Sequence, residues 1–248
     1  MLLFDTHCHL TDIFDSLPEN FPADYSCIGN ILSVTYRYSD WDKNILFAKR
    51  FVNVIPAFGI HPLFITDDDK NHLNQYESYL DIFPTSIIGE IGLDFYHNPT
   101  YSEKLKQYDL FSQQIAIAKH FQRPIIIHQR KSQQECISLL KSQNFDCGGF
   151  AHGFSGSLEQ ALQWIDYGFV LGIGCVLLRN NSRLREILPR LPSWAWVLES
   201  DAPFMQKNNS PIIIQEIAKI AAKLCNKNTE DITNNTTNNV YRILNMYS

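Results

Sequence analysis

Short apolar runs alternate along the chain with longer segments in which apolar residues recur every three or four positions. The short runs predict eight strands, at 2–4, 27–35, 52–60, 85–91, 124–128, 150–152, 169–177 and 194–198. Most of these runs are apolar at every position, which is typical of parallel strands covered on both faces. The pattern therefore favours a buried parallel sheet.

Helical spacing of apolar residues separates most of the runs. We expect helices over 41–51, 67–83, 101–121, 132–143, 158–165 and 213–224, with a short helix after Thr229. The segment 11–26 contains Pro18 and Pro22 and is interpreted as an irregular loop. The clearest helix is 101–121, where one apolar stripe is predicted from Leu105, Tyr108, Phe111, Ile115 and Ala118.

Eight strands alternating with helices in 248 residues predict an α/β fold, the (β/α)₈ TIM barrel, formed as a single domain by residues 1–248. The alternative is an open, doubly wound sheet. No GxGxxG sequence follows the first strand, which argues against the dinucleotide-binding form of that sheet. No internal repeat or change in composition divides the chain.

Composition and charge limit the substrates, partners and cellular locations expected for this barrel. The chain is 45% hydrophobic and 19% charged, as ordinary globular proteins are, and its net charge is −5. A nucleic-acid substrate would therefore need a local basic rim and metal ions to offset phosphate repulsion. The six cysteines lack a CxxC spacing and are interpreted as reduced thiols. With no signal-peptide pattern and no membrane-length apolar run, we expect a cytoplasmic protein with no membrane partner, and we infer no obligate protein partner.

Histidines and carboxylates occur where the predicted strands end. His7 and His9 point to one side of the first strand, because strand side chains alternate, and two adjacent imidazoles can chelate a divalent ion. An isolated pair of this kind could equally be hydrogen-bonded within a loop. Further polar residues end the third, fourth, fifth, sixth and eighth strands: His61, Glu90, Asp94, His128, His152 and Asp201. Because the carboxyl ends of barrel strands meet at one rim, these residues predict a two-metal site.

The segments that carry these residues resemble the TatD family of metal-dependent deoxyribonucleases, which belongs to the amidohydrolase superfamily. They are 4–10 (FDTHCHL), 59–62 (GIHP), 89–94 (GEIGLD), 124–128 (PIIIH), 152–156 (HGFSG), 198–203 (LESDAP) and, near the end, 239–242 (NVYR). The resemblance covers nearly the whole chain in the same order. It implies a hydrolase that cleaves DNA phosphodiesters in the 3′-to-5′ direction.

The resemblance also implies a role for each matching residue. His7 and His9 would bind a first divalent ion with Asp201 beside it, Glu90 would bridge two ions, and the second site would be completed by His128 and His152. A carboxylate with two oxygens can span ions about 3.5–4 Å apart. Imidazole and carboxylate ligands suit Mg²⁺, Mn²⁺ and Zn²⁺, and ligand type does not choose among these ions.

The catalytic carboxylates implied in this way are Asp201 and Glu90. The two ions would activate a water molecule, and Asp201 would accept its proton before attack on phosphorus. His61 and Arg130 are the predicted substrate-side donors, since an arginine can grip a phosphate with two hydrogen bonds. Asp94 is interpreted as an orienting partner of a metal-binding histidine. Glu199 is interpreted as a structural carboxylate in a salt bridge or hydrogen bond.

Two loops depart from the family pattern. Gln129-Arg130-Lys131 stands where members commonly have Ser-Arg-Asp, and 207–211 is shorter than the usual loop with Arg-Asn-Glu-Pro. A positive rim could still be supplied by residues in loops after strands: Arg130, Lys131, Arg179, Arg183 and Lys207. With an acidic chain, we expect short or end-directed engagement of DNA and little affinity for long duplexes.

Two other functions stay open. A related hydrolase could act on a carboxylic ester, a lactone, an amide or the ester that links an amino acid to tRNA, and it would have an apolar pocket without phosphate donors. A non-catalytic metal-binding barrel that serves as a protein partner would instead show a large exposed apolar patch at the rim.

Overall fold

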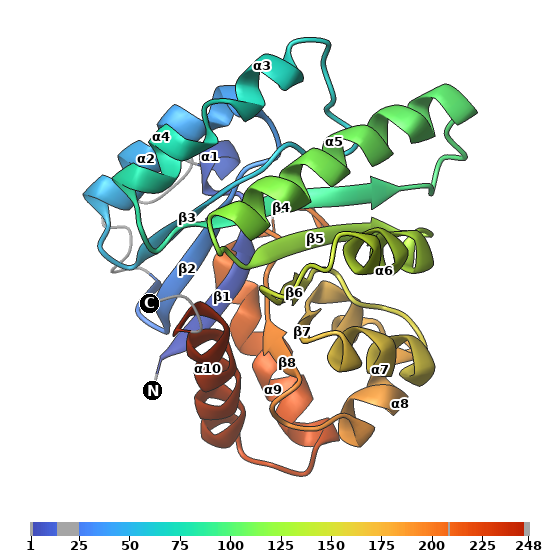
Figure 1. Ribbon diagram of the computed structural model, residues 1–248. Helices are drawn as coiled ribbons and strands as arrows, with labels where there is room; N and C mark the ends of the chain where they lie inside the picture. The colour runs from blue at the N-terminus through green and yellow to red at the C-terminus, as the bar shows by residue number, and fades with distance from the viewer. Residues whose placement is uncertain (1, 14–24, 208, 246–248) are drawn as a thin grey trace.

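The computed structural model describes residues 2–13, 25–207 and 209–245, which form one parallel sheet surrounded by helices (Figure 1). The strands pair in chain order: β1 (Leu3–Cys8), β2 (Ile28–Val34), β3 (Val54–Phe58), β4 (Ile87–Asp94), β5 (Ile125–Arg130), β6 (Gly149–Ala151), β7 (Phe169–Ile173) and β8 (Trp196–Leu198). Each neighbouring pair from β1–β2 to β7–β8 is parallel.

Hydrogen bonds between β1 and the segment after β8 bring the two edges of the sheet together. Cys8 and Ala202 form a parallel bridge. The His9 amide donates to the Ala202 carbonyl at 2.8 Å, and the Asp201 amide donates to the His7 carbonyl at 2.8 Å. The sheet is therefore a nearly closed barrel, which confirms the predicted single-domain (β/α)₈ fold.

The helices lie outside the sheet (Figure 1). They are α1 (Leu10–Ile13), α2 (Trp41–Arg50), α3 (Asp69–Leu73), α4 (Tyr76–Ile82), α5 (Tyr101–His120), α6 (Gln133–Ser142), α7 (Leu158–Asp166), α8 (Leu184–Ile187), α9 (Ile214–Leu224) and α10 (Thr229–Asn245). Single 3₁₀ turns occur at η3 (Tyr38–Asp40), η4 (Cys175–Leu178), η5 (Leu188–Arg190) and η6 (Pro211–Ile213). Within the described residues, no helix combines the length and the apolar character needed to cross a membrane.

The apolar core has two layers, because successive strand residues face opposite sides of the sheet. Ile125 and Ile127 of β5 belong to the outer layer between sheet and helices, whereas Ile126 belongs to the inner layer. The inner layer contains Phe4, Leu32, Val34, Ala57, Ile87, Ile126, Phe150, Val170, Val197, Val240 and Ile243. This layer fills the barrel, so the interior is packed and the polar residues are confined to its rim.

Helix α10 covers the end of the barrel where the strands begin. The Thr237 hydroxyl donates to the Leu2 carbonyl at 3.1 Å, and the Asn239 amide donates to the Trp196 carbonyl at 2.8 Å. Val240 and Ile243 of the same helix join the inner layer. The opposite end, where the strands finish, is left for a site.

The predicted strand 169–177 is too long. Strand β7 ends at Ile173, and Cys175–Leu178 forms the 3₁₀ turn η4. Cys175 and Leu177 are buried in the outer layer of the core. The sequence therefore stays apolar beyond the end of the strand because these residues are buried.

Three helical predictions also differ from the structure. The segment 67–83 contains two helices, α3 and α4, separated at Asn74 and Gln75. Residues 10–13 form α1 where a loop is predicted from residue 11, and 14–24 of that prediction lie outside the described residues. Helix α10 has 17 residues and is not short. Its Thr- and Asn-rich sequence has low helix propensity, but packing against β1 and β8 outweighs that preference.

Candidate metal centre

The carboxyl ends of the strands surround a cavity of about 750 Å³. Its lining contains His9, His61, Glu90, Asp94, His128, Arg130, His152 and Asp201 from the predicted site. His7 is fully buried directly beneath this cavity, 3.3 Å from the Glu90 carboxylate. The structure therefore brings together side chains from β1, β4, β5 and the segments after β3, β6 and β8.

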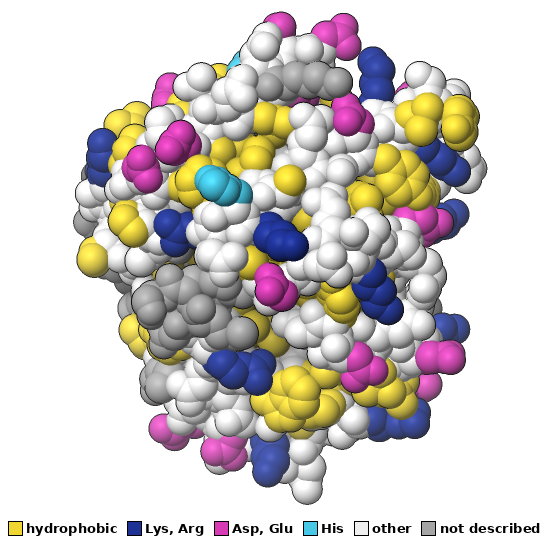
Figure 2. Space-filling view, in the orientation of Figure 1, with side chains coloured by type: hydrophobic (Ala, Val, Ile, Leu, Met, Phe, Trp, Pro, Cys, Tyr) yellow, Lys and Arg dark blue, Asp and Glu magenta, His cyan; other side chains and the backbone are white. Residues whose placement is uncertain are grey.

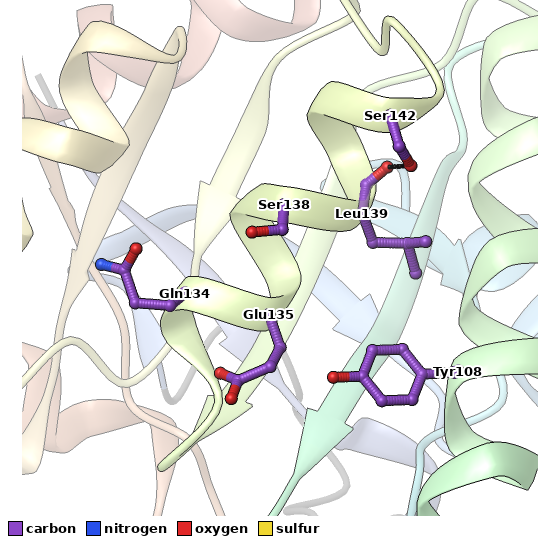
Figure 3. A pocket seen from close by; sticks show the side chains of 6 residues that line it. All are labelled: Tyr108, Gln134, Glu135, Ser138, Leu139 and Ser142. Carbon is purple, nitrogen blue, oxygen red and sulfur yellow. Dashed lines mark hydrogen bonds between the residues drawn. The ribbon is translucent and has the colours of Figure 1, made fainter.

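A second hollow, of about 450 Å³, lies on the outer surface between α5 and α6 (Figure 3). Its lining residues are Tyr108, Gln134, Glu135, Ser138, Leu139 and Ser142. The Ser142 hydroxyl donates to the Leu139 carbonyl of its own helix at 2.7 Å. With one carboxylate and no histidine among its described lining residues, this hollow lacks a converging ligand set, so the strand-end cavity is the candidate site.

The first group of potential ligands consists of His7, His9 and Asp201. Nε2 of His7 lies 3.1 Å from Nε2 of His9, and Nε2 of His9 lies 3.6 Å from Oδ1 of Asp201. Nδ1 of His9 lies 3.0 Å from the Val34 carbonyl, to which it can donate. That hydrogen bond places the proton on Nδ1 and leaves the Nε2 lone pair facing the site.

Glu90 lies between the two groups of histidines. Its Oε1 lies 2.7 Å from Nδ1 of His128, and its Oε2 lies 3.3 Å from Nε2 of His7. Burial alone would raise the pKa of Glu90, but the imidazoles of His7 and His61 hold it well below its ordinary value. The buried side chain is therefore a carboxylate with one oxygen directed at each group.

Carboxylates hold the outer nitrogens of the second pair of histidines. Nε2 of His128 lies 2.9 Å from Oδ2 of Asp94, and Nδ1 of His152 lies 3.0 Å from Oε2 of Glu199. Glu199 is fixed in turn, because its Oε1 accepts the Gly153 amide hydrogen at 2.8 Å. Asp94 and Glu199 are thus placed to orient the two rings, whose other nitrogens face the cavity.

Asp201 is a second carboxylate that lies near histidines of both groups. Its Oδ2 lies 3.6 Å from Nε2 of His152, and its Oδ1 lies 3.6 Å from Nε2 of His9. Burial acts to raise the pKa of Asp201, yet the nearby His152 lowers it below its ordinary value. Conversely, Glu199 and Asp201 hold the pKa of His152 well above its ordinary value against the effect of burial. In the metal-free protein these groups form a network of carboxylates and imidazolium.

The turn that carries Asp201 is tied to the first strand. Asp201 has a φ of 53°, in the left-handed region that Asp tolerates better than most residues. Oδ1 of the fully buried Asp5 accepts hydrogen bonds from the amides of Ser200 at 2.9 Å and His7 at 3.2 Å. Burial raises the pKa of Asp5 to about 7. Asp5 thus holds the backbone of His7 in register with that of Ser200, the residue before Asp201.

The position of Glu199 depends on a glycine in the neighbouring strand. A Cβ atom at Gly172 would lie 2.0 Å from Oε2 of Glu199. The carboxylate that supports His152 therefore occupies space that only glycine leaves open.

His61 has the geometry of a hydrogen-bond donor. Its Nδ1 accepts the Leu63 amide hydrogen at 3.1 Å, so the neutral ring carries its proton on Nε2. That Nε2 lies 3.7 Å from Oε1 of Glu90. Burial and the neighbouring His128 lower the pKa of His61 to about 3, so the ring is neutral. His61, Glu90 and His128 are close enough to hold an ion, but this tautomer directs an N–H at the cavity.

The predicted basic rim is only partly at the cavity. Arg130, Lys131 and Arg179 line it, whereas Arg183 and Lys207 are exposed and are not among its described lining residues. The Arg130 guanidinium lies over the ring of Tyr96, 3.9 Å from the centroid. Figure 2 shows basic and acidic side chains interspersed on the face in view.

Sequence reasoning missed the aromatic residues at the mouth of the cavity. Tyr36, Phe64 and Phe204 line it, together with Tyr96. The signal that could have found them is their position, because Phe64 and Phe204 each follow a site residue, His61 or Asp201, by three positions.

The donor set fits divalent metal ions. Two Nε2 atoms only 3.1 Å apart, His7 with His9, would oppose their lone pairs unless a proton or a cation lay between them. The neighbouring donors are carboxylate oxygens, and imidazole with carboxylate is a ligand combination used for Zn²⁺, Mn²⁺ and other divalent ions.

Comparisons with known proteins place the chain among metal-dependent hydrolases. The family model described as TatD related DNase matches residues 4–245. The uncharacterized metal-dependent hydrolase YjjV of Escherichia coli K12 is 28% identical over 258 residues, which cover 98% of this chain and 97% of YjjV. An uncharacterized metal-dependent hydrolase of Haemophilus influenzae is 31% identical over 265 residues, with 98% and 99% covered.

Solved structures show the same likeness. The crystal structure of YjjV, a TatD homologue, superposes with a TM-score of 0.84 at 25% identity, and 98% of each chain is covered. A TatD family hydrolase of Entamoeba histolytica shares the fold, with a TM-score of 0.79 at 19% identity over 98% of both chains.

Proposed function

The chain belongs to the TatD-related DNase family of metal-dependent hydrolases, and from that premise we propose that its substrate is DNA, shortened from the 3′ end by hydrolysis of phosphodiesters. The observation that carries this proposal is the position of Glu90, with one oxygen toward His128 and the other toward His7. Two ligand groups joined by one carboxylate suit a two-metal hydrolytic site, of the kind that nucleases and phosphatases use.

The predicted ligands are His7, His9, Glu90, His128, His152 and Asp201. Divalent ions bound there would supply Lewis acidity toward a phosphate oxygen and would lower the pKa of water. The oxygens of Asp201 lie 3.6 Å from Nε2 of His9 and 3.6 Å from Nε2 of His152, beside both ligand groups, where the carboxylate would accept a proton from the attacking water. Nε2–H of His61 points into the cavity to donate to a phosphate oxygen. Arg130, supported by Tyr96, can bind a second phosphate oxygen.

The proposal extends to the cellular location and the binding partners of the enzyme. All six cysteines are free thiols in the described part of the chain, which supports a reducing, cytoplasmic location. DNA is the proposed partner, engaged briefly or at its ends, and neither a membrane nor an obligate protein partner is required.

One observation favours a second candidate. Phe64 and Phe204 at the cavity mouth are 42% and 45% exposed, and such apolar surface suits the acyl part of a carboxylic ester, a lactone, an amide or an aminoacyl-tRNA ester. The three basic residues at the other side favour the phosphodiester.

A direct assay separates the two candidates. Protein supplied with Mg²⁺, Mn²⁺ or Zn²⁺ is incubated with 5′-labelled single-stranded and duplex DNA, and with a panel of carboxylic esters and lactones. We expect progressive shortening of the DNA from the 3′ end, which stops when a chelator is added. Ester hydrolysis without nucleotide release would instead establish the second candidate.

Asp201→Asn tests the proposed proton acceptor. We expect its turnover to fall by about 10²–10⁴-fold, because the amide cannot take the proton. Circular dichroism should show an unchanged fold. Asp166→Asn, at the exposed end of α7, is the matched control and should keep full turnover. Undiminished hydrolysis in Asp201→Asn would contradict the role.

A further inference from the structure

The mouth of the cavity has two chemically different sides. Aromatic side chains follow β2, β3 and β8, on the part of the barrel around β1: Tyr36, Phe64 and Phe204. Basic side chains end β5 or follow β5 and β7: Arg130, Lys131 and Arg179. Glu90 and the histidines lie between the two sides. A ligand that spans the cavity therefore meets flat apolar surface at one end and positive charge at the other.

The aromatic side rests directly on the candidate ligands. The Phe204 ring lies 5.0 Å from the His9 ring at 74°. The Phe64 ring lies 5.6 Å from the His61 ring and 4.5 Å from that of Tyr36. Because these ring centroids are so close, a group stacked on Phe64 or Phe204 would be separated from the metal centre by no more than the length of one sugar.

The support beneath Phe64 is held in place. Tyr36 is only 6% exposed, and its hydroxyl donates to Oδ1 of Asp12 at 2.7 Å. The same hydroxyl accepts a hydrogen bond from Arg37 at 2.8 Å. Phe64 itself stays 42% exposed. An exposed ring on an ordered support is a preformed surface for a flat ligand, because little side-chain freedom remains to be lost on binding.

The two sides together select the class of ligand. Exposed aromatic side chains in a cavity that also holds fixed cations are the combination that binds single-stranded nucleic acid, through base stacking and phosphate contacts. An acyl group would use the aromatic side alone and would bring no anion to the three cations. A nucleotide uses both, since its base is flat and its phosphate lies one sugar away.

We propose that Phe64 and Phe204 form a platform for the nucleobase adjacent to the scissile phosphate, while Arg130 binds that phosphate and the strand's further phosphates run along Lys131 and Arg179. This inference rests on the proposed function for the identity of the scissile bond, but the platform itself is defined by binding. It assigns a fixed orientation to the substrate, with the base over the β3 and β8 ends and the phosphates over the β5 and β7 ends.

Equilibrium binding to the metal-loaded protein tests the platform without turnover. The two probes are deoxyadenosine 5′-monophosphate and 2-deoxyribose 5-phosphate, which share the sugar and the phosphate and differ by the base. We expect the wild type to bind the nucleotide about tenfold more tightly, equivalent to about 1.4 kcal/mol. Equal affinity for the two probes would overturn the proposal.

Variants test whether the preference for the nucleotide comes from the rings of Phe64 and Phe204. Phe64→Ala and Phe204→Ala should each lower the ratio of the two affinities toward one and leave the binding of 2-deoxyribose 5-phosphate unchanged. Phe64→Tyr and Phe204→Tyr should retain the ratio. Arg130→Ala should weaken both probes by a similar factor. Tyr101→Ala, at a 78% exposed aromatic residue at the start of α5, is the control and should change neither affinity.

The outcomes also separate this inference from the proposed function. Suppose that the protein prefers the nucleotide, that both Ala variants abolish this preference, and that the protein cleaves no DNA. The platform would then be supported and the proposed nuclease activity would be contradicted. Cleavage of DNA by a protein that binds both probes equally would support the nuclease activity and contradict the platform. Ala variants that lose affinity for both probes equally would show that the rings support the metal centre and do not stack the base.

Discussion

Asp5 is a buried carboxylate that does not face the cavity, and its two oxygens have different surroundings. Oδ1 accepts the amide hydrogens of His7 and Ser200, whereas Oδ2 has no hydrogen-bond partner among the described residues. Burial raises the pKa of Asp5 from 3.8 to about 7, which means that folding favours the protonated form. The residue therefore contributes to stability in a pH-dependent way, apart from its part in aligning the site.

The sign of that dependence follows from linkage. A group whose pKa is higher in the folded state stabilises fully below its unfolded pKa, here 3.8, and loses this contribution as the pH rises through about 7. We expect the free energy of unfolding of the metal-free wild type to fall, relative to Asp5→Asn, by up to about 1.4 kcal/mol for each pH unit in this window. Urea unfolding of both proteins at pH 5, 6, 7 and 8 measures the difference. Parallel stability curves would show that Asp5 does not titrate there.

The places of the candidate ligands could be predicted because each stands at the end of an apolar run. The position of His7, His9, His128 or His152 needs only the strand pattern and the rule that barrel strands finish at one rim. The tautomer of His61 could not be predicted, because it depends on the Leu63 amide that turns back onto Nδ1. The partner of Glu199 could not be predicted either, since His152 is 47 positions away in sequence (199 minus 152).

At the scale of elements, α5 does more than cover the sheet. Gln114 is fully buried, and its amide both accepts from the Ile60 backbone N–H at 2.9 Å and donates to the Ile60 carbonyl at 3.0 Å. Gln107 binds the backbone of Asp94 in the same way, at 2.8 and 3.1 Å. Two side chains of one helix thus satisfy backbone groups next to His61 and at Asp94 itself.

Removing one of these amides should destabilise the protein and disturb the site. We expect Gln114→Ala to lower the free energy of unfolding by about 1–3 kcal/mol, because the N–H and C=O of Ile60 lose their buried partners. If His61 donates to substrate, the displaced backbone should also raise KM more than it lowers kcat. Gln113→Ala is the matched control, since among the described residues the Gln113 amide donates within its own helix, to the Asp109 carbonyl at 3.3 Å.

Denaturant unfolding and steady-state kinetics of both variants provide the comparison. The control should stay within about 0.5 kcal/mol of the wild type. Equal losses in the two variants would contradict a specific role for the contact with Ile60.

The glutamines also explain where the predicted stripe of α5 fails. Leu105 is assigned to the buried face by spacing, yet it is 49% exposed, while Gln107 and Gln114 are buried. Hydrophobic periodicity locates a helix by counting apolar residues, so it misses polar residues that are buried to satisfy backbone groups. The helix and most of its face are predictable, but its rotation about its axis is not.

For the whole molecule, the candidate ligands tie distant parts of the barrel together. His7 and Asp201 lie on the two edges that close the sheet, and Glu90, His128 and His152 come from the opposite strands. Any ion held by this set binds the folded protein and not the unfolded chain, so it should stabilise the fold. The barrel itself was predictable from the alternation of elements, whereas α10 required packing against β1 and β8 that its sequence does not reveal.

Removal of metal tests this coupling. At a free ion concentration of about 100 times Kd, we expect a gain of about 2.7 kcal/mol in the free energy of unfolding, which a chelator abolishes. Differential scanning calorimetry with and without the ion measures it as a rise in Tm.

Glu90→Gln should lose most of this gain, because the amide cannot serve both ligand groups as the carboxylate does. Glu135→Gln, in the outer hollow of Figure 3, should keep the full gain. A Tm that is indifferent to both the ion and the chelator would argue against a bound metal.

The contact between Gly172 and Glu199 has a consequence for how this chain can evolve. A Cβ atom at position 172 would collide with the carboxylate that steadies His152, so an alanine there is compatible only with a shorter or differently placed side chain at 199. Mutation at the two positions is therefore epistatic, and homologous lineages are expected to exchange them as a pair. Gly172 is assigned no contact with ion or substrate, yet it limits which sequences can keep His152 supported by a carboxylate.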